Sequence, residues 1–208
     1  MDDMNSIVSN QDKILISQVK EWGEILINFE SRNRYRICDE EGEELGFAAE
    51  EGGGLGAMLG RNFLGSARAC TLHVFDRHGT EVGQGKKPFR WFFYEMVAIE
   101  NGRLVGRVKR RFAVLNRRFT VYDAEGKELF EIFSPLFRIW TFKVQAGGVE
   151  IARINKKWSG LLKEAFSDAD NFGVEFFGQQ PPADFQKLLL FATFLIDFCF
   201  FENNNSRH

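Results

Sequence analysis

The 208-residue chain has little of what enzymes, zinc sites and disulfide-linked proteins need. Its three cysteines, Cys38, Cys70 and Cys199, are odd in number and widely spaced, which indicates reduced thiols in a cytosolic setting. The three histidines show no metal-ligand spacing beside these cysteines. A Gly-x-Ser-x-Gly nucleophile motif is also missing. We therefore expect a protein that is not an enzyme and holds no zinc.

Long apolar runs are missing as well. The uncharged run Leu188–Ile196 has nine residues, whereas a membrane-spanning helix needs about 20. From Phe185 to Phe201 the only charged residues are Lys187 and Asp197, so a helix here is apolar on every side and must be buried in protein or in lipid. Its length favours protein, with Asp197 hydrogen-bonded near one end. We expect these side chains to be buried: Leu188, Phe191, Leu195, Phe198 and Cys199.

The middle of the chain repeats one pattern, an alternating strand, a turn and another alternating strand. Several turns carry Asp at the first position and Gly at the fourth, as in Asp39–Gly42, Asp76–Gly79 and Asp123–Gly126. Asp accepts hydrogen bonds from backbone N–H groups and Gly accepts the left-handed conformation, which suits a type I turn. Successive turn glycines from Gly79 onward are separated by 23, 24 and 22 residues, the length of two strands with their connections.

These hairpins predict a mainly β fold. An antiparallel sheet that closes into a barrel has no exposed edges, and about twelve strands leave an interior too wide for strand side chains alone to fill. We expect such a barrel to surround the hydrophobic C-terminal helix. The domain organisation predicted is a flexible N-terminus over residues 1–13, a barrel domain over 14–202 and a polar tail over 203–208. The polar opening of the chain indicates no secretory signal.

Charge is segregated along the chain. Between Asp39 and Glu51 there are seven acids and no bases, whereas Arg61 to Arg118 holds thirteen Lys or Arg against four Asp or Glu. Such segregation indicates an anionic partner, with an ordinary solvated face or the protection of an edge strand as the alternatives. On a strand, Arg107, Lys109 and Arg111 would share one face. The predicted ligands of phospholipid headgroups are Lys86, Lys87, Arg107, Lys109, Arg111, Arg117 and Arg118.

Several segments resemble the phospholipid scramblase family. Lys157–Phe176 followed by Phe194–Glu202 is similar to the C-terminal signature of that family. Three further segments fit the family in the same order: Gly60–Gly65, Lys87–Arg90 and Ser134–Phe137. The resemblance covers roughly residues 14–202. The family is itself similar to tubby-like domains, whose fold is a twelve-stranded β-barrel around a buried C-terminal helix, so the resemblance implies the fold that the hairpins predict.

The resemblance implies bidirectional movement of phospholipids between the leaflets of the plasma membrane, without covalent chemistry. It implies a cytoplasmic location at the inner face of that membrane, with anionic phospholipids or the membrane surface as partner. No nucleic-acid partner is expected, and oligomerisation is left open. The alternative is a soluble tubby-like module that binds anionic phospholipid or phosphoinositide headgroups as a membrane-tethered scaffold.

The resemblance also implies a calcium-binding loop before the C-terminal helix. The twelfth position of that loop, where a bidentate carboxylate is needed, is Gln179. Two carboxylates make a poor calcium site, so any affinity should be weak, and a capped turn followed by a strand is the favoured alternative. Calcium is the one cofactor considered, and the positions that match the family's ligands are Asp168, Asp170, Phe172, Val174 and Phe176.

Overall fold

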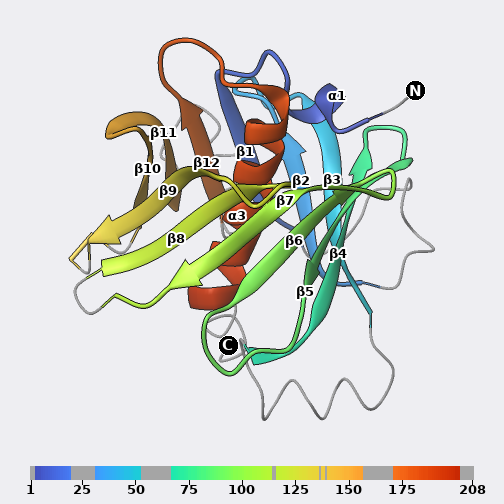
Figure 1. Cartoon of the computed structure of the whole chain (residues 1–208). Coiled ribbons are helices and arrows are strands. Elements are labelled where there is room, and N and C mark those ends of the chain that lie inside the picture. The colour runs from blue at the N-terminus through green and yellow to red at the C-terminus, as the bar shows by residue number, and fades with distance from the viewer. Residues whose placement is uncertain are drawn as a thin grey trace.

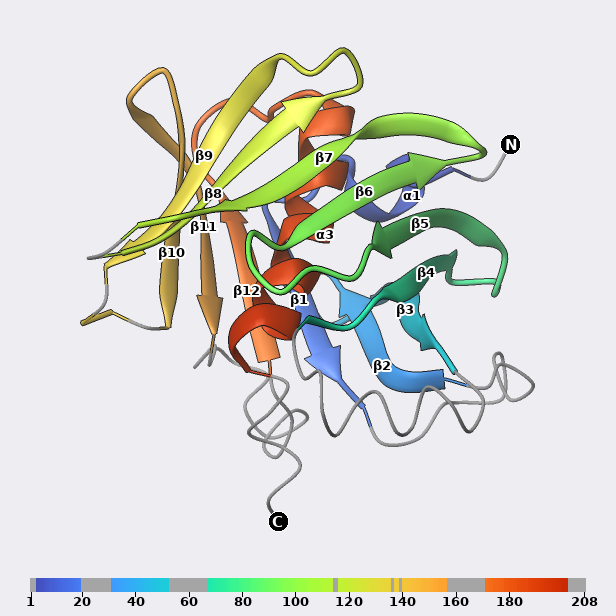
Figure 2. The ribbon, with the colours of Figure 1, turned by 60° about the horizontal axis from the view of Figure 1, so that its bottom comes forward.

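Twelve antiparallel strands form a closed barrel in the computed structural model. The strands follow one another around the ring in chain order, and β1 closes it by pairing with β12. Figures 1 and 2 show the ring of strands around the C-terminal helix α3. The closed barrel confirms the fold that the sequence predicts. The structure describes residues 3–19, 31–52, 67–113, 116–135, 137–138, 140–156 and 171–201.

The elements within these ranges are two helices and the twelve strands. The helices are α1 (Asn5–Val8) and α3 (Ala183–Phe200). The strands are β1 (Lys13–Gln18), β2 (Ser31–Cys38), β3 (Glu44–Glu51), β4 (Cys70–Asp76), β5 (Glu81–Lys87), β6 (Glu95–Glu100), β7 (Arg103–Arg111), β8 (Asn116–Asp123), β9 (Glu128–Pro135), β10 (Thr141–Ala146), β11 (Val149–Lys156) and β12 (Asn171–Phe176).

The hairpin turns have the chemistry that the sequence predicts. In the β4–β5 turn, Asp76 Oδ1 accepts hydrogen bonds from the backbone N–H groups of His78 and Thr80, at 2.9 and 2.8 Å. Asp39 and Asp123 accept equivalent bonds in their own turns. Each carboxylate satisfies backbone donors that have no strand partner, so these turns fix the register of the strands that they join.

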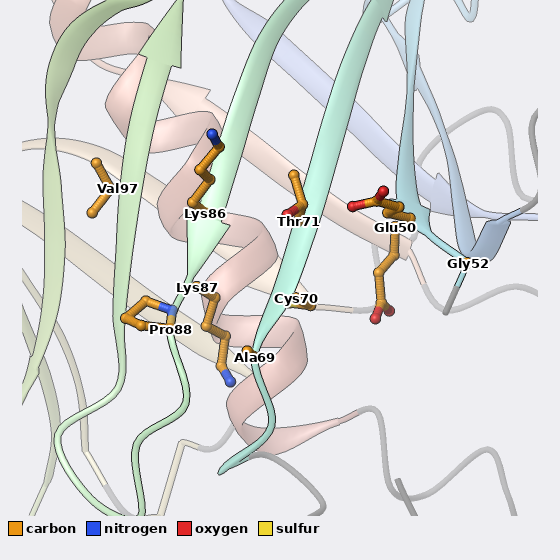
Figure 3. Close-up of a pocket in the computed structure, with 10 residues that line it drawn as sticks. Glu50, Gly52, Ala69, Cys70, Thr71, Lys86, Lys87, Pro88 and Val97 are labelled. Carbon is orange, nitrogen blue, oxygen red and sulfur yellow. The ribbon is translucent and has the colours of Figure 1, made fainter. Parts of the chain in front are cut away.

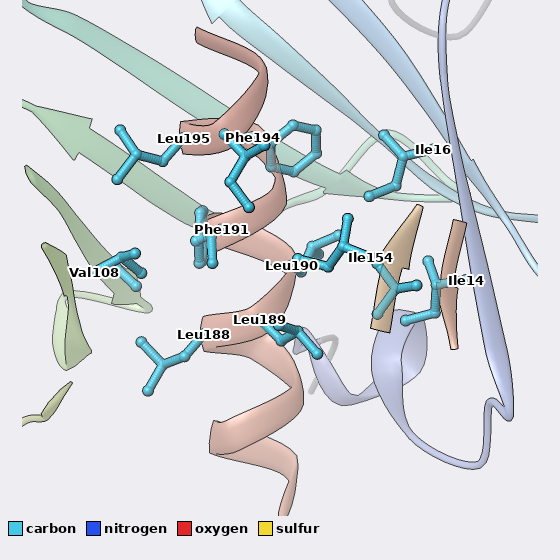
Figure 4. Close-up of a cluster of buried hydrophobic side chains, with 14 of the residues drawn as sticks. Ile14, Ile16, Val108, Ile154, Leu188, Leu189, Leu190, Phe191, Phe194 and Leu195 are labelled. Carbon is cyan, nitrogen blue, oxygen red and sulfur yellow. The ribbon is translucent and has the colours of Figure 1, made fainter. Parts of the chain in front are cut away.

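Helix α3 fills the barrel, as its apolar surface requires. Leu188, Phe191 and Leu195 are fully buried and Phe198 is 1% exposed. Figure 4 shows side chains of α3 directed toward surrounding strands, with Ile14 and Ile154 on one side and Val108 on another. Cys199 is only half-buried, because it lies in the last turn of α3 at the opening of the barrel. No helix within the described residues is long and apolar enough to span a membrane.

Glycine lets the helix approach the wall closely at two strands. A Cβ at Gly85 of β5 would lie 2.8 Å from Cδ1 of Phe191. A Cβ at Gly106 of β7 would lie 3.0 Å from the methyl groups of Leu188 and against the carbonyl oxygen of Tyr122. A side chain at either position would need space that α3 occupies. These two glycines therefore set the distance between α3 and the strands β5 and β7.

The charged residues of α3 have partners inside the barrel. Lys187 Nζ lies 2.9 Å from Glu100 Oε2 of β6, and both side chains are less than a tenth exposed. At the other end of the helix, the Tyr35 hydroxyl donates a 2.7 Å hydrogen bond to Asp197 Oδ2. This bond confirms the prediction that Asp197 is hydrogen-bonded near one end. Pairing makes burial of these groups tolerable, because an unpaired charge there would cost several kcal/mol, roughly 3–5.

The N-terminal residues differ from the prediction of a flexible segment. Helix α1 packs against α3 and β3, and Met4, Ile7 and Val8 are fully buried. The backbone N–H of Met4 also donates a 3.0 Å hydrogen bond to Glu100 Oε1. The apolar residues at spacings of three and four place one face of this short helix over the barrel opening, beside the start of α3.

The two openings of the barrel are built differently. At one, which we call the turn end, tight turns join β2–β3, β4–β5, β6–β7, β8–β9 and β10–β11. At the other, the loop end, the β5–β6, β7–β8 and β9–β10 connections lie beside the last residues of α3, as Phe200 packs against Phe119 and Phe142 near the strand starts. In Figure 1 the β5–β6 connection and the end of α3 are both at the bottom.

Candidate functional site

A row of basic side chains lies on the outer surface of the barrel. In β7, Arg107 and Arg111 are exposed and Lys109 is half-exposed, while Val108 between them is fully buried in the core. The alternation follows from the pleat, which sends successive side chains to opposite faces. The predicted outward row of β7 is therefore present in the structure.

Strand pairing brings two further basic side chains to this row. Lys86 of β5 is in register with Val97 of β6, which is in register with Arg107. On the other side, Arg118 of β8 pairs directly with Arg111. We call this set the cationic face, and its members are Lys86, Arg107, Lys109, Arg111 and Arg118.

Few carboxylates balance the cationic face. Lys109 Nζ lies 3.8 Å from Glu95, and Arg118 lies 3.5 Å from Glu131. Lys86, Arg107 and Arg111 form no ion pair with the described residues. Like charges placed opposite one another, as Arg111 and Arg118 are, destabilise a sheet. An anion bound between them would remove that repulsion.

Two predicted headgroup ligands lie elsewhere. Lys87 is 2% exposed, and its ammonium group donates a hydrogen bond to the carbonyl oxygen of Arg68 and lies 5.2 Å from the ring centre of Tyr94. Arg117 lies 4.3 Å from the ring centre of Phe200. Adjacent residues of a strand point to opposite faces, so Lys86 and Lys87 cannot both face outward. Figure 3 shows these two side chains leaving β5 in different directions.

The inward-facing bases surround the end of α3, and we call Lys87, Arg110, Arg117 and Lys156 the inner cations. Arg110 lies 4.9 Å from the ring centre of Phe200, and Lys156 lies 3.8 Å from that of Phe201. The last turn of α3 carries no basic residue of its own. Because the carbonyl end of a helix attracts positive charge, the strands supply cations that the helix lacks. Burial, and then the charge of Arg110, lower the pKa of Arg117.

A hollow of about 590 Å³ opens beside the cationic face. Its lining includes Lys86, Thr71, Val97 and Cys70, which Figure 3 shows on the neighbouring strands β4, β5 and β6. Glu50 also lines it, but its carboxylate is buried and holds Arg68 in an ion pair, so it does not neutralise Lys86. Glu51, whose side chain is 62% exposed, lines the hollow as well, so the hollow beside Lys86 holds charge of both signs.

The proposed calcium positions are only partly described. Asp168 and Asp170 lie outside the described residues. Phe172, Val174 and Phe176 lie in β12, which pairs with β1 on one side and β11 on the other, and their side chains are buried. These three side chains offer no oxygen ligand, and this part of the chain is a strand rather than a cation-binding loop. Among the described residues, no three His, Cys, Asp or Glu side chains gather as a metal site would require.

Comparison with known proteins agrees with this architecture. A sequence model of the family described as Scramblase matches residues 2–203. The chain belongs to the scramblase family. It is 32% identical over 213 residues to Phospholipid scramblase 2 of Homo sapiens, covering 94% of this chain and 69% of the relative. It is 31% identical over 222 residues to Phospholipid scramblase 1 of Homo sapiens, covering 96% and 66%.

More distant relatives extend the comparison. Altered inheritance rate of mitochondria protein 25 of Saccharomyces cerevisiae is 24% identical over 204 residues, covering 86% of this chain and 62% of the relative. An X-ray structure of an Arabidopsis thaliana protein superposes with a TM-score of 0.51 at 17% identity, covering 89% of this chain and 90% of that one. At this identity the likeness concerns the fold alone, and the fold is the one that the scramblase-family resemblance implies.

Two features of the site were missed by sequence reasoning. The predicted headgroup ligands mixed outward and inward residues, although the period of two in β7 and β8 could have separated Arg117 from Arg118. Of the inner cations, Arg110 and Lys156 were not predicted, because each contacts the end of α3 only through the closure of the barrel around that helix. The sequence does indicate them in one way. Residues two apart on a strand share a face, so a basic residue two positions from a core residue, as Lys156 is from Ile154, should also face inward.

Proposed function

We propose that this protein binds anionic phospholipid headgroups at its cationic face and moves phospholipids between the leaflets of a bilayer. The observation that carries the proposal is the unbalanced cationic face in a chain of the scramblase family. Lipid movement is what the names of the human relatives state of those proteins. We further propose that the protein acts from the cytoplasmic side, at the inner face of the plasma membrane, where anionic lipids attract basic residues.

The filled barrel restricts how a lipid could move. Helix α3 occupies the interior with fully buried Leu188, Phe191 and Leu195, so a headgroup has no path through the barrel described here. Lipid would therefore move along the outside of the protein, where bound headgroups and local distortion of the bilayer lower the cost of crossing. Because the described part of the proposed calcium loop is a buried strand, we expect activity that changes little with calcium.

Vesicle binding tests the headgroup step. Neutralising Arg107→Gln, Lys109→Gln and Arg111→Gln together should weaken binding to phosphatidylserine vesicles at least tenfold, since a basic residue near an anionic surface contributes about 1 kcal/mol. The matched control, Arg36→Gln, Arg77→Gln and Lys127→Gln, removes the same charge from the turn end and should change binding far less. Equal losses in both variants would mean that only net charge matters, and the cationic face would be abandoned.

A flip-flop assay tests the transport step. Purified protein in vesicles with a fluorescent lipid is treated with dithionite, which quenches the outer leaflet, with and without millimolar calcium. We expect a slow loss of inner-leaflet signal that the cationic-face variant reduces and calcium leaves nearly unchanged. Rapid loss on adding calcium, abolished by Asp168→Ala with Asp170→Ala, would replace this account with a calcium-gated one. A signal no different from protein-free vesicles would refute transport but leave headgroup binding standing.

A further inference from the structure

The loop end exposes nearly all of the large apolar side chains that this barrel leaves in solvent. Of eight such residues among those described, seven lie in the β5–β6, β7–β8 and β9–β10 connections, and the eighth, Val149, lies at the turn end. We call the seven the aromatic rim: Phe89, Trp91, Phe92, Phe93, Phe112, Phe137 and Trp140. Soluble proteins rarely gather exposed apolar groups in this way unless they bind a protein or a membrane.

The rim is held outward by its backbone as well as by its sequence. Phe93 has φ +56°, in the left-handed region that aromatic residues avoid, yet its side chain is 60% exposed. Phe92 is 77% exposed beside it. The backbone strain at Phe93 is not offset by burial, because the rings of Phe92 and Phe93 are both exposed. Strained backbone of this kind is found most often at functional sites.

Basic side chains and rim side chains share one hollow. A space of about 490 Å³ between the β5–β6 connection and the end of β7 is lined by Phe92, Phe93 and Phe112 together with Arg90, Lys109, Arg110, Arg111 and Glu95. Lys109 and Arg111 are also members of the cationic face. This arrangement is complementary to a lipid at the bilayer surface. The aromatic rings would contact the acyl chains, and the basic side chains would contact the anionic phosphate next to them.

The two ends of the barrel carry opposite net charge. The β5–β6, β7–β8 and β9–β10 connections and their flanks hold ten Lys or Arg and one acid, over residues 86–95, 107–118 and 135–141, and the described end of β3 adds Glu50 and Glu51 beside Arg68. The tight turns and their flanks hold twelve Asp or Glu against three Lys or Arg, over residues 39–44, 76–81, 100–103, 123–128 and 146–150. An anionic surface attracts the first end and repels the second, so it orients the molecule before contact.

We propose that the barrel docks on an anionic bilayer with its loop end down, inserting the aromatic rim into the headgroup–acyl boundary. The hollow between Phe92 and Phe112 then takes the phosphate of one anionic lipid among Arg90, Lys109 and Arg111. Aromatic side chains favour this boundary, because their apolar rings leave water while the basic side chains next to the rim stay among the hydrated headgroups. The inference rests on the proposed lipid binding and adds to it an orientation and an insertion depth.

Environment-sensitive probes test the orientation. Single cysteines are introduced in the full chain at two rim positions, Phe112→Cys and Phe137→Cys, and at two exposed turn-end positions, Glu41→Cys and Glu125→Cys. The background carries Cys70→Ser and Cys199→Ser, and Cys38 stays because it is buried. Each variant is labelled with a nitrobenzoxadiazole dye, checked for an unchanged unfolding transition, and mixed with phosphatidylserine vesicles while co-sedimentation is measured in parallel.

We expect a blue shift and a rise in emission at positions 112 and 137, and none at 41 and 125. In a companion experiment, Phe112→Ser with Phe137→Ser should weaken vesicle binding about tenfold, and this loss should persist at salt concentrations that screen the cationic face, since it reflects apolar contact. Val149→Ser, at the turn end, is the matched control and should change nothing.

The other outcomes separate this inference from the proposed function. If all four probes stay in water while the protein co-sediments, headgroup binding stands and rim insertion is refuted, leaving a protein partner for the rim. A shift at positions 41 or 125 instead would reverse the orientation. Absence of co-sedimentation would refute lipid binding and the docking together.

Discussion

The turn end and the loop end are made by the same twelve strands but hold different kinds of charge. At the turn end the buried charges are paired, with Glu100 joined to Lys187, to Arg103 and to the backbone of Met4. At the loop end the buried Glu50 is likewise paired with Arg68, but exposed Arg111 faces Arg118 across the sheet, and aromatic rings are exposed. Buried charges that are paired stabilise the fold, whereas exposed basic and aromatic side chains are available for binding. The comparison assigns stability to the first end and binding to the second.

Breaking the ion pair at the turn end should give the largest effect. Glu100→Ala leaves Lys187 buried without its nearest carboxylate, and such a charge costs about 3–5 kcal/mol of unfolding free energy. Chemical denaturation measures this loss. Vesicle binding by the protein that remains folded should be unchanged, since Glu100 is buried and pairs with Lys187 inside the barrel, whereas the cationic face lies on the outer surface.

A second substitution is the control for this reading. Glu100→Leu combined with Lys187→Met removes both charges and should recover much of the stability lost in Glu100→Ala. If Glu100→Ala unfolds no more easily than the wild type, the turn end is not the stabilising end and the comparison fails.

A smaller loss is expected where the helix meets the wall between the two ends. Gly106→Ala places a methyl group against Leu188 and the Tyr122 carbonyl, and overpacking of this kind costs about 1–3 kcal/mol. Gly102→Ala, in the neighbouring turn with open space around it, measures the separate cost of a side chain at a positive φ, which Gly106 does not have. If α3 sits loosely in the barrel, Gly106→Ala will leave the unfolding free energy unchanged.

The pH dependence of stability sharpens the account of the turn end. Burial disfavours the ionised form of Asp184, but hydrogen bonds and charge from Arg103 and Lys187 outweigh burial and hold its pKa below the ordinary 3.8. Because the folded pKa is depressed, the stabilisation is present above 3.8 and is lost as the pH falls through the folded pKa. Asp184→Asn should therefore be less stable than the wild type at neutral pH and equal to it in strong acid. A difference that is the same at both pH values would contradict the assignment.

Thiol reactivity should show the smallest effect. Cys38, where β2 reaches the turn end, is buried, and desolvation by burial raises its pKa to about 12. Cys70 and Cys199, at the loop end, are half-buried. Since the thiolate is the reactive species, a thiol reagent should label Cys38 last in the folded protein. Mass spectrometry of the labelled peptides measures the order, and early labelling of Cys38 would mean that the turn end opens readily.

Much of the fold could be predicted because its signals are local. The Asp and Gly positions of the turns, such as Asp76 and Gly79, lie within a few residues of each other, and the apolar surface of α3 lies in one continuous run. The partner of Lys187 could not be predicted, since Glu100 is 87 residues away in the chain and meets it only in the closed barrel. Helix α1 was missed because only its contact with α3 makes so short a segment stable.

The candidate site was predicted in part for the same reason. The outward row Arg107, Lys109 and Arg111 follows from the period of a single strand. Its continuation to Lys86 and Arg118 depends on register with neighbouring strands. The aromatic rim is assembled from three separate connections, so the sequence contains its residues but not their grouping at one end.

The central claim is that α3 stays inside the barrel while the loop end meets the bilayer. Amide hydrogen exchange with and without phosphatidylserine vesicles tests both parts in one measurement, because protection reports local opening and new contacts. We predict slow exchange across Leu188–Ile196 in both conditions, and protection that appears only with vesicles across residues 89–94 and 109–113. Vesicles that leave these connections unchanged while Leu188–Ile196 loses its barrel protection would contradict the account and indicate that the helix itself leaves the barrel for the membrane.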